Sequence, residues 1–61
     1  MEIMTTKELA KYLRINVWVI YEMVKKNEIP YFKIRTNIRF SKEAIREFIN
    51  KAREANNEKS G

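Results

Sequence analysis

Basic side chains in this sequence gather in one segment. Residues 25–42 carry six basic residues and one acidic residue, Glu28, whereas residues 1–24 and residues 43–61 are each neutral overall. The net charge of +5 therefore belongs to this one segment. Ammonium and guanidinium groups at this density attract a polyanion through its phosphates. The alternative is a basic surface that only keeps the protein soluble.

Several residue types that support catalysis are missing. The 61 residues make one small domain, include no cysteine and no histidine, and have a single glycine, Gly61. This composition excludes disulfides, the usual zinc clusters, Cys–His and Ser–His nucleophile pairs, and a glycine-rich phosphate loop. We therefore expect no enzyme and no cofactor or metal. The longest apolar run, residues 17–21, is far shorter than the roughly 20 residues of a membrane helix, so we expect a cytoplasmic protein with no membrane partner.

Two helices are predicted in the first half of the chain. Thr5 is followed three residues later by Glu8, which predicts a capping box and a helix that ends near Leu13 or Arg14. Asn16 is the next predicted cap, and it opens a helix over about residues 17–26. This second helix is apolar on more than one face, so part of its surface must stay exposed or contact a partner.

A β-hairpin is predicted next, because residues 31–40 alternate apolar and basic side chains with a period of two. Asn27, in a left-handed conformation, would end the preceding helix. The predicted register puts four apolar residues on the core face, in the pairs Phe32–Phe40 and Ile34–Ile38. It puts Lys33 opposite Arg39 on the outer face and leaves a three-residue loop, 35–37, with Asn37 left-handed.

A third helix is predicted after Ser41, which would cap it. Its apolar stripe is Ala44, Ile45, Phe48, Ile49 and Ala52. The predicted core of the hairpin and this helix is Phe32, Ile34, Ile38, Phe40, Phe48 and Ile49. Because the residues from Asn56 onward are polar, we expect one domain over residues 1–55 and a disordered polar tail over residues 56–61.

The predicted elements follow one another as helix, turn, helix, hairpin and helix. This order predicts a mostly α fold with a small β-hairpin, the winged helix-turn-helix. In that fold the second helix is the element that enters the major groove of DNA.

Four short motifs stand in order along the chain: Met4-Thr5-x-x-Glu8-Leu9-Ala10-x-x-Leu13, Asn16-x-x-x-Ile20-Tyr21, Ile29-Pro30-x-x-Lys33-Ile34 and Arg39-Phe40. Together they resemble the excisionase-type, MerR-like winged helix-turn-helix DNA-binding domains, over residues 4 to about 50. Arg14 occupies a turn position where glycine is usual in such domains. Residues 17–19 are apolar where such domains usually have polar or basic residues.

The resemblance implies binding of double-stranded DNA, with the second helix in the major groove and the hairpin wing along the backbone or minor groove. The positions carried over to the groove-facing side are Asn16, Val17, Trp18, Tyr21, Glu22 and Lys25, and those of the wing are Lys33, Arg35 and Arg39. Such domains include excision factors for recombination and small transcription regulators, so both roles are expected. The resemblance also allows a homo-oligomer or cooperative assembly on DNA, and a recombinase or other protein partner.

Three environments are open for Trp18 at this point. It could contact thymine methyl groups or a base step in DNA, anchor a protein interface, or fold back against the wing or the first helix. The second of these leads to an alternative function, a protein-interaction module that uses the apolar surface of the second helix. Arg35 is expected either to enter a narrow minor groove or to remain solvated at the tip of the wing.

Overall fold

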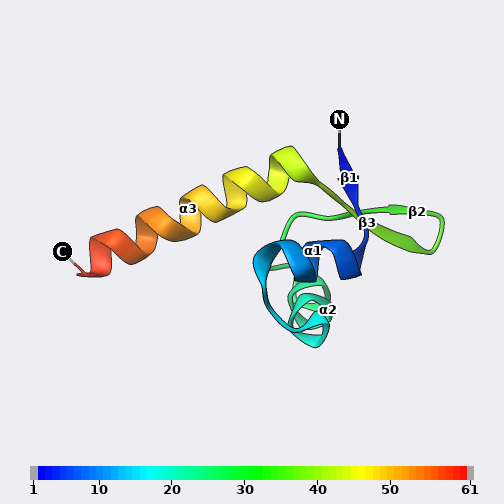
Figure 1. Ribbon diagram of the computed structural model, residues 1–61, viewed down its shortest axis with the longest axis horizontal. Helices are drawn as coiled ribbons and strands as arrows, with labels where there is room; N and C mark the ends of the chain where they lie inside the picture. Colours follow the sequence, from blue (N-terminus) through cyan, green and yellow to red (C-terminus); the bar gives the residue numbers. More distant parts are fainter. Residues whose placement is uncertain (1, 61) are drawn as a thin grey trace.

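The computed structural model describes the backbone of residues 2–60 and the side chains of residues 2–56. It contains three helices and three short strands in the order predicted for the helices and the hairpin (Figure 1). The elements are β1 (Ile3–Met4), α1 (Thr6–Leu13), α2 (Val17–Lys25), β2 (Phe32–Ile34), β3 (Asn37–Ser41) and α3 (Lys42–Ser60). This arrangement is the winged helix-turn-helix fold, with the β2–β3 hairpin as the wing.

The predicted caps of α1 and α2 are confirmed. The Thr5 hydroxyl accepts a hydrogen bond from the Glu8 N–H at 3.1 Å, and the Glu8 carboxylate accepts one from the Thr5 N–H at 2.8 Å. The side-chain oxygen of Asn16 accepts from the Trp18 N–H at 2.8 Å. Between the helices, Arg14 is left-handed with φ 58° and ψ 43°, a conformation that favours glycine.

Strand β1 was not predicted from the sequence. It forms one edge of an antiparallel sheet with the strand order β1-β3-β2, in which Ile3 pairs with Ser41 and Met4 pairs with Phe40. A strand of two residues is too short to produce a period-two pattern. Its pairing with a segment more than 30 residues away brings Met4 into the core.

The predicted hairpin register is wrong by one residue. The observed pairs are Phe32 with Arg39, Lys33 with Ile38 and Ile34 with Asn37. The loop is therefore two residues long, 35–36, and its left-handed residue is Arg35 (φ 59°), not Asn37. Two-residue loops are the commonest hairpin connections because their twist matches that of the flanking strands.

This register changes which side chains share a face of the wing, since paired residues lie on the same side of a sheet. Lys33 shares the core face with Ile38, whereas Arg39 lies on the opposite face with Ile34. Ile34 is 54% exposed, and Phe32 is half-buried and outside the described core cluster. The prediction that these two side chains belong to the core is therefore wrong.

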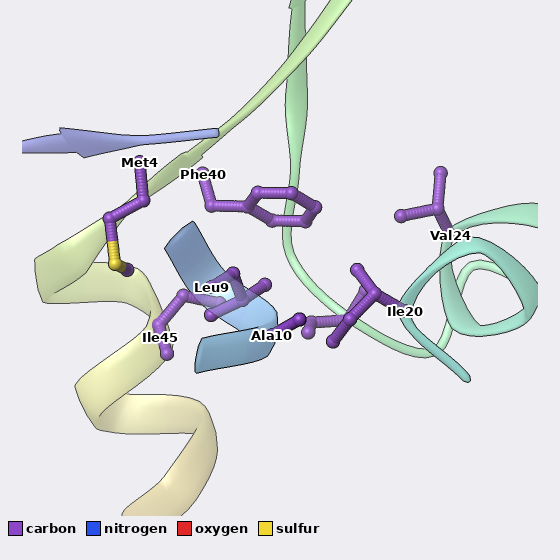
Figure 2. Packing of buried hydrophobic residues seen from close by; sticks show 8 residues of the cluster. Met4, Leu9, Ala10, Ile20, Val24, Phe40 and Ile45 are labelled. Atoms are coloured by element: carbon purple, nitrogen blue, oxygen red, sulfur yellow. The ribbon is translucent and has the colours of Figure 1, made fainter. Parts of the chain in front are cut away.

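The core is formed mainly by side chains from β1, β3, α1, α2 and the first turn of α3 (Figure 2). Its buried side chains are Met4, Leu9, Ala10, Ile20, Val24, Ile29, Phe40 and Ile45. The partly buried side chains around it include Ile38, Phe48 and Ile49. The predicted core positions of Phe40, Ile38, Phe48 and Ile49 are therefore confirmed, with Phe40 fully buried at their centre.

Helix α3 starts at its predicted cap, because the Ser41 hydroxyl accepts from the Ala44 N–H at 3.4 Å. It is anchored by Ile45 and extends away from the other elements, on the side opposite to the wing (Figure 1). Its backbone remains helical to Ser60, where the sequence predicted a disordered tail from residue 56. The division of the chain at residue 55 stays a prediction, and the side chains beyond residue 56 lie outside the described residues.

Candidate nucleic-acid interface

Helix α2 buries one face and exposes the other. Ile20 and Val24 are buried, and Val17 packs at the edge of the core, so this predicted site residue is half-buried. The exposed side chains of the helix are Trp18, Val19, Tyr21, Glu22 and Lys25. Three of the five are aromatic or aliphatic, which confirms that α2 carries more apolar surface than the domain buries.

Trp18 and Tyr21 form an aromatic pair on this outward face. Their ring centroids are 5.9 Å apart and the rings are inclined by 66°, which is an edge-to-face arrangement. Trp18 is nevertheless 71% exposed and Tyr21 is 44% exposed. The alternative in which Trp18 folds back as peripheral core is therefore wrong, whereas contacts with DNA or with a protein remain compatible with its position.

Asn16 lies at the start of α2, and its side chain already has a structural role. The oxygen of its amide group accepts the hydrogen bond that caps the helix, which leaves the amide nitrogen and one lone pair of the oxygen for a ligand. A bidentate contact with adenine uses both groups, so the same oxygen would have to serve the base and the cap together.

The six basic side chains of residues 25–42 divide into four that are exposed and two that already contact other groups of the protein. Lys25, Lys26, Lys33 and Arg35 are exposed at the C-terminal end of α2 and on the wing. Arg39 is half-buried, and its guanidinium donates to the Ile38 carbonyl at 2.8 Å. Lys42 is also engaged, with its ammonium 3.5 Å from the Glu2 carboxylate and 5.5 Å from the centre of the Tyr12 ring.

The predicted wing residues therefore differ in what they can contact. Lys33 and Arg39 were expected opposite each other on one face, but the observed register separates them onto two faces. Lys33 shares the sheet face that covers the helices, and Arg35 lies in the loop at the wing tip. Lys26 adds an exposed cation next to Lys25 that the predicted set of DNA-binding residues did not include, although the charge of residues 25–42 had already indicated it.

No helix within residues 2–60 combines the length and the apolar character needed to cross a membrane. Comparisons with curated proteins and with solved structures found no significant match. The model of the helix-turn-helix domain family, in contrast, matches residues 3–53. The match covers β1, α1, α2, the wing and the first part of α3. The chain therefore belongs to the helix-turn-helix domain family, a family of DNA-binding domains.

Proposed function

We propose that this protein binds double-stranded DNA with α2 in the major groove and the β2–β3 wing along the backbone or minor groove. The observation that carries the proposal is the group of exposed cations on these two elements of a helix-turn-helix domain: Lys25, Lys26, Lys33 and Arg35. Side chains of this kind contact phosphates and set the position of such a domain on the duplex.

Within residues 2–56 these four cations have no acidic partner at ion-pair distance. Among residues 2–56 the one ion pair joins Lys42 to Glu2, away from the wing. An unpaired surface ammonium or guanidinium can contact a phosphate without first breaking an internal pair. The same groups would repel one another in the free protein, and a polyanion would relieve that repulsion.

The resemblance to excisionase-type and MerR-like domains supports two roles, a recombination directionality factor and a small transcription regulator, both exercised in the cytoplasm. One module of this size covers little DNA, so useful specificity favours two or more copies assembled side by side. A recombinase would be a further partner in the first role.

The test is fluorescence anisotropy of a labelled random duplex titrated with the full chain at three salt concentrations. If four phosphates are neutralised, the logarithm of the affinity should fall linearly with the logarithm of the salt concentration, at a slope of about −3.6. A duplex that stays unbound at the lowest salt would overturn the proposal.

A second candidate function is a protein-interaction module, and the exposed Trp18 favours it, because exposed aromatic side chains are frequent anchors of protein interfaces. Affinity purification with two variants separates the candidates. A protein complex should be lost with Trp18→Ala and kept with Lys33→Glu combined with Arg35→Glu. Salt-dependent DNA binding should show the opposite pattern.

A further inference from the structure

We propose that α2 recognises base pairs through the 5-methyl groups of thymine in the major groove, and not through hydrogen bonds to base edges. This inference rests on the proposed function, because it requires α2 to lie in the groove. The interface should prefer duplexes that have A·T pairs under the first turns of α2.

The first turns of α2 offer few hydrogen-bonding groups to a base. The Asn16 oxygen already accepts the hydrogen bond of the cap at 2.8 Å. Lys25 lies seven residues after Trp18, about 10 Å further along the helix axis, where its ammonium is suited to a phosphate. Glu22 is only an acceptor when ionised, so it cannot donate to the N7, O6 or O4 acceptors that bases present in the major groove.

Apolar surface dominates the same part of the helix. Trp18 is 71% exposed, and Val19 and Tyr21 are exposed beside it. Thymine carries the one apolar group that base pairs present in the major groove, its C5-methyl. If the face of the indole ring is pressed against guanine, it covers the O6 and N7 acceptors, and its one donor, the Nε1–H, points along the ring plane and away from them. Unpaired polar groups are costly to bury.

The aromatic pair also prepares this surface for binding. The edge-to-face contact between Trp18 and Tyr21, with centroids 5.9 Å apart, restricts the indole before any ligand arrives. A restricted side chain loses less conformational entropy on binding than a free one. The pair therefore forms a pre-ordered apolar surface on the helix that also carries the exposed cations Lys25 and Lys26 at its C-terminal end.

The experiment starts with the selection of bound duplexes from a random library by the full chain. The selected duplex is then synthesised with thymine and with uracil at the same positions, because uracil lacks the methyl group and keeps every hydrogen-bonding group. Burial of one methyl group corresponds to about a fourfold gain in affinity. We expect the uracil duplex to bind about fourfold more weakly for each methyl group contacted, with an unchanged salt slope.

Two variants assign the effect to Trp18. Trp18→Ala should bind the thymine and uracil duplexes equally well while keeping its salt slope and its circular dichroism spectrum. Tyr12→Ala removes an exposed aromatic ring from α1 and should retain the preference for thymine. Equal affinity of the unmodified chain for the two duplexes would overturn this inference and leave DNA binding intact, whereas failure to bind any duplex would overturn both proposals.

Discussion

Replacing Lys33 with glutamine should remove one phosphate contact, whereas replacing Arg39 with glutamine should remove none. The reason is the register of the wing, which puts Lys33 on the face that covers the helices and Arg39 on the opposite face. Lys33 is exposed, while Arg39 is half-buried and its guanidinium donates to the Ile38 carbonyl at 2.8 Å. Both substitutions remove one positive charge, so each serves as the matched control of the other.

The magnitude follows from the number of exposed cations on α2 and the wing. With four phosphates neutralised, raising the salt from about 50 to about 200 mM should weaken binding about 150-fold. With Lys33→Gln three phosphates remain, and the same change of salt should weaken binding about 40-fold. With Arg39→Gln four phosphates remain neutralised, so the same change of salt should still weaken binding about 150-fold.

The assay is anisotropy of one labelled duplex, titrated with the three proteins at several salt concentrations. The slopes of log affinity against log salt are compared, because a slope reports phosphate contacts and does not depend on the sequence of the duplex. A slope that falls by about 0.9 for Arg39→Gln and not for Lys33→Gln would refute the assignment of the two faces.

Two further predictions concern stability, measured by thermal denaturation. Arg14→Gly should stabilise the fold by about 0.5–1 kcal/mol, because glycine adopts the left-handed backbone at φ 58° without strain. The control, Lys11→Gly inside α1, should destabilise the fold by about 1 kcal/mol. An Arg14→Gly variant less stable than the unmodified chain would contradict this reasoning. Ile34→Thr should cost less than about 0.5 kcal/mol because Ile34 is 54% exposed, whereas Ile38→Thr should cost about 1–2 kcal/mol. Comparable costs for the two substitutions would favour the register that pairs Ile34 with Ile38 on the core face. In a domain of this size 1 kcal/mol corresponds to a shift in Tm of about 4–8 °C.

The candidate interface was predictable where charge and sequence spacing decide it. The excess of positive charge over residues 25–42 pointed to the wing, and the surplus of apolar residues in the second helix pointed to Trp18. The sequence did not predict that Lys33 is exposed and that Arg39 is hydrogen-bonded to the Ile38 carbonyl, because the face on which each side chain lies depends on the strand pairing. The exposure of Trp18 was likewise not predictable, because it depends on which surface of α2 the other helices and strands pack against.

The sequence alone determined the elements that depend on near neighbours. The capping box of Thr5 and Glu8, the Asn16 cap and the order of helices and hairpin follow from residues no more than a few positions apart, whose groups meet in any structure that forms the helix. Tertiary structure decided the register of the wing and the existence of β1. A shift of one residue in a short hairpin keeps the alternating pattern and changes only which side chains meet the core. The observed pairing brings Phe40 into the core beside Met4 of β1. These two residues are far apart in the sequence, so no pattern of neighbouring residues predicts their contact.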